Sequence, residues 1–263
     1  MGGFPGSVLL DGGQYHTSST KRHPLGTRGY TQDGRVFRYA RNGSAGLNPG
    51  MMCQAEASSA DFEAEPIADA TDFAVPSTSS TVFYLSTATS MATADAFADG
   101  YYMVTAGTTT AEVGQMLQIE SCPKSDGAAG PSGNPRIYVY SEDKLVTALS
   151  TTDTITLQKN PYDSIIGTLQ AAPTGIAVGV AVTDVAASYY FWLQTWGMAC
   201  MRVSDTWDTG HNIIYASATG NDRLGEALPS STLEVDKGAA IVGIAQYIGT
   251  DGYAGSAMLT LAP

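Results

Sequence analysis

The sequence predicts an all-β protein, with an extended N-terminal arm followed by β-sandwich or barrel-like units. From residue 80 onward, short runs of β-branched and aromatic residues recur at intervals of about ten to twenty residues. Turns rich in glycine, proline and asparagine separate these runs, and a sustained helical period of apolar residues is almost absent. Short strands joined by such turns are typical of sandwiches and barrels. The expected strands are residues 81–85, 101–105, 115–119, 136–140, 154–157, 176–182, 189–196, 199–203, 212–216 and 239–249.

Residues 1–54 are expected to form the arm and the first β hairpin. Residues 1–25 contain glycine, serine and histidine without an apolar period, which favours an extended segment. Asp33-Gly34 is a hairpin signal, and the alternation in residues 35–41 predicts the strand that follows it.

The remaining chain divides into a linker and two β units. Residues 55–75 carry six carboxylates among many alanines, and Pro66 limits any helix there, so we expect an acidic linker. Residues 76–160 then form the first β unit. Asn160-Pro161 marks a break, and residues 161–263 form the second β unit.

Charge is low and unevenly distributed. Only 14% of the residues are charged, against about 25% in ordinary domains, and the net charge is −12. Such a surface suits a protein that covers itself with other subunits, although a robust monomer is the alternative. Residues 1–41 hold six basic and two acidic side chains, a net +4, while the remainder is −16. The basic segment could dock onto an acidic surface or be a solvated tail. The acidic total argues against nucleic acid as a partner.

Cysteine usage and hydropathy give the expected compartment. The three cysteines are far apart and form no CxxC pair, which argues against a disulfide framework or a zinc site. No signal peptide is recognisable at the start of the sequence, and no apolar run reaches the roughly 18 residues of a membrane helix. We therefore expect a soluble chain made in a reducing cytoplasm, with no membrane partner.

The densest aromatic segment is residues 189–197. In a strand, alternate residues point to opposite faces, so Tyr190, Trp192 and Trp196 would share one face. A strand that is apolar on both faces belongs in the middle of a sandwich or has its outer face buried by a partner. Core is the first expectation, and a subunit interface or a carbohydrate-stacking surface is the alternative.

The sequence contains none of the common catalytic or metal-binding motifs. It lacks HExxH, Cys/His clusters, a Gly-x-Ser-x-Gly elbow and a Walker loop. Carboxylate pairs of the glycosidase type depend on spatial approach and are not readable from sequence. We expect no catalytic residues, no metal and no cofactor, and hence a protein that is not an enzyme.

Three stretches resemble the decoration (cement) proteins of tailed bacteriophages. They are residues 25–54, which include the string DGRVFRY, residues 97–101 with 114–119, and residues 179–181 with 190–197. The order and spacing of these stretches carry the resemblance. It implies an all-β protein that sits on the capsid lattice, often as a trimer, and locks capsomers against internal DNA pressure. The chain departs from the pattern after Gly197, and residues from 205 onward match nothing in it.

The expected function is therefore that of a decoration protein on the outer capsid surface of a virion. Its partners would be the major capsid protein and further copies of itself, as a homotrimer. A tail or head fibre protein with a receptor-binding role is the first alternative, and a carbohydrate-binding module or enzyme is the second, supported only by Trp192, Trp196 and Trp207. Long fibres usually show internal repeats, and none is visible. The side chains expected to form ion pairs with the capsid are Arg28, Arg35, Arg38 and Arg41.

Overall fold

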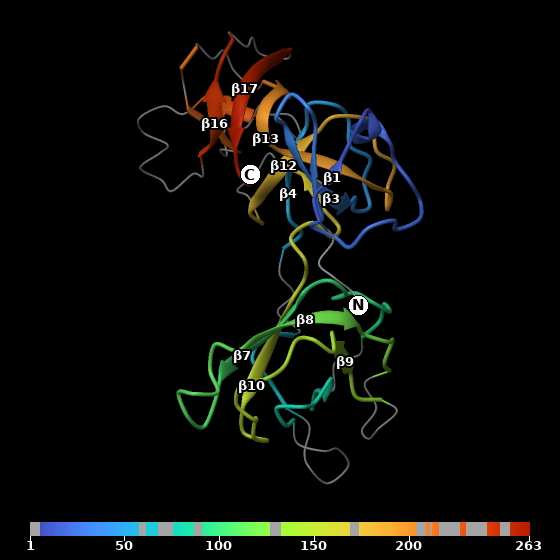
Figure 1. The fold of residues 1–263 in the computed structure, drawn as a ribbon, viewed down its shortest axis with the longest axis vertical. Helices are drawn as coiled ribbons and strands as arrows, with labels where there is room; N and C mark the ends of the chain where they lie inside the picture. Colours follow the sequence, from blue (N-terminus) through green and yellow to red (C-terminus); the bar gives the residue numbers. More distant parts are fainter. Residues whose placement is uncertain are drawn as a thin grey trace. The chain divides into compact units, whose positions relative to one another are not determined.

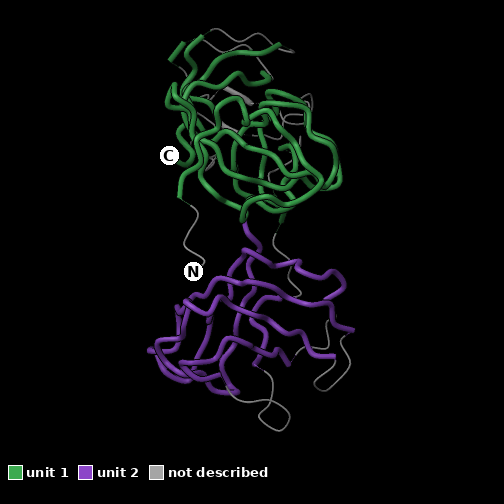
Figure 2. Tube along the Cα trace, turned by 45° about the vertical axis from the view of Figure 1, so that its right-hand side comes forward, with its two compact units in different colours: residues 1–57, 161–263 green, residues 58–160 purple. Residues whose placement is uncertain are grey.

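The chain folds into two compact units, one of which is inserted into the other (Figure 2). Unit 1 combines Met1–Ala57 with Pro161–Pro263, and unit 2 is the intervening Ser58–Asn160. The computed structural model describes residues 6–57, 62–67, 76–86, 91–126, 133–168, 174–203, 209–210, 212–215, 227–229, 241–247 and 253–263. The described residues are almost entirely in strands and turns, with a single short 3-10 helix, η1 (Gly13–Tyr15), among them. The all-β prediction is confirmed.

Unit 1 contains an eleven-stranded sheet. The path through the sheet runs β1-β2-β3-β13-β17-β16-β14-β15, and β4, β11 and β12 pair off this path. All pairings are antiparallel except the parallel pair of β1 and β2. The strands are β1 (Val8–Leu9), β2 (Arg28–Tyr30), β3 (Val36–Arg41), β4 (Met52–Gln54), β11 (Ile166–Gly167), β12 (Ala177–Ala181), β13 (Tyr190–Arg202), β14 (Asn212–Tyr215), β15 (Ala227–Pro229), β16 (Ile241–Ala245) and β17 (Ala254–Thr260).

Strand β13 organises this sheet (Figure 1). Its first half pairs with β3 and β12, whereas residues 196–202 pair with β17. The register with β3 shifts between Gln194 and Trp196, and Gly197 follows with φ of 86°. A bulge followed by a residue in the left-handed region bends a strand, and glycine adopts this region without strain. One long strand therefore pairs with β3 and β12 in its first half and with β17 in its second half.

Apolar clusters lie on both faces of β13. Trp192 packs with Leu10, Leu25, Phe37 and Tyr39 in one cluster. The alternate residues Phe191 and Leu193 belong to a second cluster, together with Ala40, Leu47, Met51, Cys53, Ala55, Ile165, Val178, Ala181 and Val185. A third cluster lies around β16, β17 and the second half of β13. The first expectation for the aromatic segment, a core strand, is confirmed for Trp192.

The N-terminal segment is not an extended arm, and this corrects the sequence expectation. Residues of this segment supply β1, β2 and β3 to the sheet of unit 1, and Phe37 is fully buried there. Tyr39 pairs directly with Trp192 across the β3–β13 ladder. Residues 1–41 are mostly polar, but a few apolar side chains among them pack against Trp192 of β13 in one cluster. These few side chains are enough to fix the segment on the sheet. Residues 1–54 therefore belong with the C-terminal residues rather than forming a separate region.

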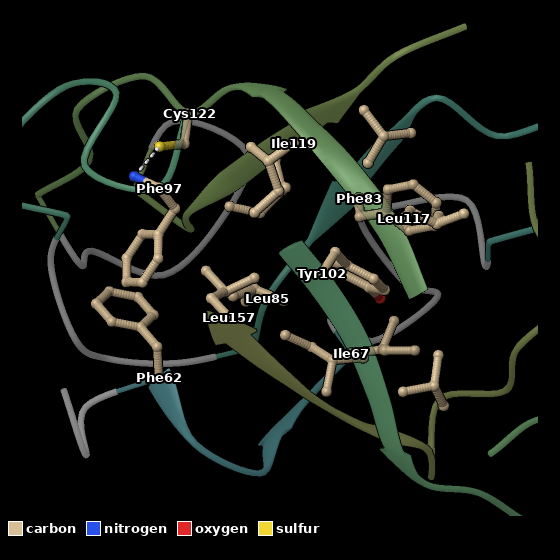
Figure 3. Close-up of a cluster of buried hydrophobic side chains, with 14 of the residues drawn as sticks. Phe62, Ile67, Phe83, Leu85, Phe97, Tyr102, Leu117, Ile119, Cys122 and Leu157 are labelled. Atoms are coloured by element: carbon tan, nitrogen blue, oxygen red, sulfur yellow. Dashed lines mark hydrogen bonds between the residues drawn. The ribbon is translucent and has the colours of Figure 1, made fainter. Parts of the chain in front are cut away.

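Unit 2 has its own sheet and its own core (Figure 3). Six strands follow the order β5-β10-β7-β8-β9-β6. They are β5 (Glu65–Pro66), β6 (Val82–Tyr84), β7 (Tyr101–Ala106), β8 (Met116–Ser121), β9 (Arg136–Val139) and β10 (Thr154–Gln158). Phe62, Ile67 and β5 come from the expected acidic linker, and both side chains are buried in this core. Residues 55–57 belong to unit 1 and residues 62–67 to unit 2, which corrects the linker expectation. The expected boundary at residue 160 coincides with the observed one.

A buried carboxylate ties two turns of unit 2 together. Asp153 is fully buried and accepts hydrogen bonds from the backbone N–H of Ser150 at 2.7 Å and of Thr108 at 3.0 Å. The hydroxyls of the same two residues donate to it at 2.8 and 3.2 Å. Burial opposes ionisation, but the hydrogen bonds outweigh it and lower the pKa of Asp153. This carboxylate therefore stabilises the fold above its unfolded pKa of about 3.9, and the contribution is lost as the pH falls through the lower folded value.

Tyr102 offers a test of this core. Its ring packs on Phe83 with centroids 4.6 Å apart, and its buried hydroxyl has no hydrogen-bond partner among the described residues. Because a buried unpaired hydroxyl costs about 1–3 kcal/mol, we expect Tyr102→Phe to raise the free energy of unfolding by about 1 kcal/mol. Tyr140→Phe is the matched control, since Tyr140 donates to Asp99 Oδ1 at 3.4 Å, and it should destabilise slightly. Urea denaturation measures both, and a loss of stability in Tyr102→Phe would contradict the prediction.

Candidate functional site

Two of the four expected capsid-contact arginines form ion pairs within the chain. Arg35 Nε lies 2.8 Å from Asp33 Oδ2, and the Arg35 guanidinium also lies 5.7 Å from the centroid of the Phe37 ring. Arg41 Nη1 lies 3.5 Å from Asp163 Oδ1, whose side chain is buried. Asp33 and Asp163 thus already pair with two arginines that were expected to pair with carboxylates of the capsid.

The other two arginines are directly opposite each other in the β2–β3 ladder. Arg28 and Arg38 are Cα partners. Arg38 donates to the main-chain oxygens of Gly26 at 3.3 Å and Pro263 at 3.1 Å. Arg28 donates to the hydroxyl of Ser7 at 3.1 Å, and its guanidinium lies 6.0 Å from the Tyr30 ring centroid. Arg28 meets neutral groups in these contacts, so its positive charge is uncompensated there.

Tyr190, Trp192 and Trp196, which were expected to share one face of the strand, separate into two environments. Trp192 is 6% exposed and Tyr190 is half-buried, and Tyr39 joins them, since it stacks on Tyr190 and meets Trp192 edge-on. Trp196 lies beyond the register shift, is half-buried, and pairs with Thr260 of β17. The structure therefore brings Tyr190 and Trp192 together and places Trp196 apart from them.

A small pocket opens beside Tyr190 and Trp192. It has a volume of about 110 Å³, and its lining comes from η1 and the following loop, from residues 22–23, and from β3 and β13. Sequence reasoning selected two of its aromatic residues. It missed His16, Arg22 and His23, because residues in a turn-rich segment show no period that would reveal what they pack against. The lining residues are Gly13, His16, Thr17, Ser18, Arg22, His23, Tyr39, Tyr190 and Trp192.

A second surface feature lies on the other part of the sheet. Met198 of β13 pairs with Met258 of β17, which pairs in turn with Ile244 of β16. Met198 is 44% exposed, Ile244 is 40% exposed, and Met258 is half-buried. We call these three residues the apolar strip. The neighbouring residues in the strands, such as Ala199 and Leu259, are buried in the core on the opposite face.

The three cysteines differ in their burial. Burial raises the pKa of the Cys53 thiol to about 12 and that of the Cys122 thiol to about 11, so both stay protonated at neutral pH. Cys200 is exposed. In the described part of the chain no three His, Cys, Asp or Glu side chains are grouped as metal ligands. Trp207, His211 and the carboxylates of Asp205 and Asp208 lie outside the described residues.

Comparisons with models of protein families, with characterised proteins and with solved structures found no match to this chain. Across the described ranges, no helix is long and apolar enough to cross a membrane.

Proposed function

We propose that this chain is a structural protein of a tailed-phage particle, which binds the outer surface of the capsid as a homotrimer and stabilises the lattice. The single observation that carries the proposal is the apolar strip of Met198, Ile244 and Met258, which lies across three paired strands of the sheet of unit 1. The low charge of the chain and its resemblance to decoration proteins support the same conclusion.

The occupant that we assign to the strip is another copy of the chain. Full burial of an exposed Met or Ile side chain contributes about 1.5–3 kcal/mol. Because Met198 and Ile244 are less than half exposed, each can add only part of that value, so the interface must also bury the residues around the strip. Closed threefold symmetry matches the local threefold points of a capsid lattice. The capsid contact is then assigned to the basic side chains, above all Arg28, whose described contacts are with the Ser7 hydroxyl and the Tyr30 ring.

The test combines self-association with capsid binding. We expect the double variant Met198→Glu/Ile244→Glu to be monomeric, because burying unpaired carboxylates costs several kcal/mol, and to decorate expanded capsids at least about 100-fold more weakly. Analytical ultracentrifugation measures the first effect, and the copy number on purified expanded capsids measures the second. The matched control is Met116→Glu/Val146→Glu, which changes two exposed apolar residues of unit 2 and should behave as the wild type.

A cryo-electron microscopy map of the virion separates the proposal from its alternative. Density for the chain on the outer capsid supports the decoration role, and particles that lack the chain should then release DNA at a lower temperature. Density in the tail or in a head fibre would refute the decoration role and favour a receptor-binding structural protein. A wild-type chain that is monomeric both in solution and on the particle would refute the trimer.

A further inference from the structure

The pocket beside β13 is built from three segments that are far apart in the sequence. Ser18 forms two backbone hydrogen bonds with Tyr190, of 2.9 and 2.8 Å, which fix the loop after η1 against β13. The backbone N–H of Arg22 donates to the hydroxyl of Tyr39 at 3.0 Å, which fixes the second loop against β3. Hydrogen bonds within the chain therefore fix the two loops that line the pocket, so the pocket forms without a ligand.

Four rings surround the pocket in close contact with one another. His23 meets Tyr39 edge-on with centroids 5.1 Å apart, and its centroid lies 5.4 Å from that of Trp192. Tyr190 stacks on Tyr39 at 5.9 Å with an interplanar angle of 9°. Tyr39 and Trp192 are buried, whereas His23 and Tyr190 are half-buried. The accessible ring surface thus belongs mainly to the two half-buried rings.

The polar part of the lining is basic or hydroxylated. Arg22 and His16 are exposed at the pocket, Thr17 and Ser18 add hydroxyls, and no acidic residue is among the lining residues. Burial raises the pKa of Tyr39, so its phenol stays neutral. An anion is favoured here, because Arg22 can bind a carboxylate and none of the described residues that line the pocket is acidic. A quaternary ammonium group could pack on the aromatic rings, but the positive charge of Arg22 would repel it.

We propose that this pocket binds one sugar ring that carries a carboxylate, of the uronic acid type, as found in acidic polysaccharides. The C–H face of a pyranose packs on half-buried aromatic rings, its hydroxyls match Thr17 and Ser18, and its carboxylate pairs with Arg22. The volume of about 110 Å³ is below the 300–1,000 Å³ of pockets for drug-sized ligands, so the pocket holds one ring of a chain. This binding activity goes beyond the proposed capsid role and does not depend on it.

The experiment compares two glycosides that differ only in the carboxylate. Saturation-transfer difference NMR on the full chain is recorded with methyl β-glucuronide and with methyl β-glucoside. We expect millimolar binding of the glucuronide and about tenfold weaker binding of the glucoside, as one charge-assisted hydrogen-bonding contact contributes. Arg22→Gln should remove the difference between the two glycosides. Tyr190→Ala should reduce saturation transfer to both.

Matched controls keep the result specific to the pocket. Arg136→Gln, in β9 of unit 2, and Tyr253→Ala, an exposed tyrosine outside the pocket, should bind as the wild type does. Equal affinity for the two glycosides would overturn the proposal, and so would unchanged binding in Arg22→Gln, whose exposed side chain can be replaced without loss of the fold. If acetate alone displaces the glucuronide at equal concentration, the site recognises only the carboxylate and not the sugar ring, and the sugar assignment is wrong.

Discussion

Replacing Phe191 by alanine is expected to lower the free energy of unfolding of unit 1 by about 3–5 kcal/mol. Phe191 is fully buried in β13 and contributes to the cluster that joins β3, β4, β12 and β13. Its partner across the ladder is Ala40, which is also fully buried and too small to fill the space that the ring leaves. The cost therefore includes a cavity as well as the lost transfer free energy of the ring.

The measurement is urea denaturation followed by circular dichroism and tryptophan fluorescence. Because the two units have separate cores, Phe191→Ala should shift the transition of unit 1 and leave that of unit 2 in place. Tyr189→Ala, two residues earlier and 37% exposed, is the control and should change the stability by less than about 1 kcal/mol. A loss of less than about 1 kcal/mol in Phe191→Ala would show that the packing around β13 differs from that described.

Local patterns predicted several of the strands, whereas β4 (Met52–Gln54) and β17 (Ala254–Thr260) were not expected. The turn signal at Asp33-Gly34 corresponds to the β2–β3 hairpin, in which Gly34 has φ of 84°. The loop is longer than the two residues first expected, because Thr31 and Arg35 form its closing hydrogen bond. The aromatic run also forms a strand, β13, although it continues to Arg202, since a bulge and Gly197 redirect the strand instead of ending it.

Pairings between distant segments could not be predicted. Apolar alternation in residues 35–41 shows that one strand face is buried, but it does not reveal that β13, some 150 residues later, is the partner. The interpretation of residues 1–54 as an arm with a separate first β hairpin followed from that limit. The prediction of a linker over residues 55–75 was wrong for a related reason. Two apolar side chains, Phe62 and Ile67, form no periodic pattern within an acidic, alanine-rich stretch.

The same limit applies to the candidate site. Tyr190 and Trp192 stand out in the sequence, but the loops that bring His23 and Arg22 beside them have no regular pattern. The ion pair of Arg35 with Asp33 is readable from their spacing, whereas that of Arg41 with Asp163 exists only in the fold. Two of the four arginines that were expected to bind a partner therefore form ion pairs within the chain, and one of these pairs could not be predicted from the sequence.

The two units should fold independently, and this is the second prediction with a large effect. Every strand of the six-stranded sheet lies between Ser58 and Asn160, and every strand of the eleven-stranded sheet lies outside that range. The chain also leaves and re-enters unit 1 at one place, since Ala55 belongs to the cluster of Phe191 and Tyr162 packs against that cluster. A short connection can therefore replace the inserted unit.

Replacing residues 58–160 by a short Gly-Ser linker is expected to leave unit 1 folded, with a urea transition close to that of unit 1 in the full chain. Residues 58–160 expressed alone should reproduce the other transition. The control is deletion of residues 1–41, which removes β1, β2 and β3 together with Phe37 and Tyr39 and should unfold unit 1. A folded body without residues 1–41 would restore the arm interpretation. Loss of all structure when residues 58–160 are excised would instead show that unit 1 depends on the insertion, because its own clusters would then be too small to offset the conformational entropy of its chain.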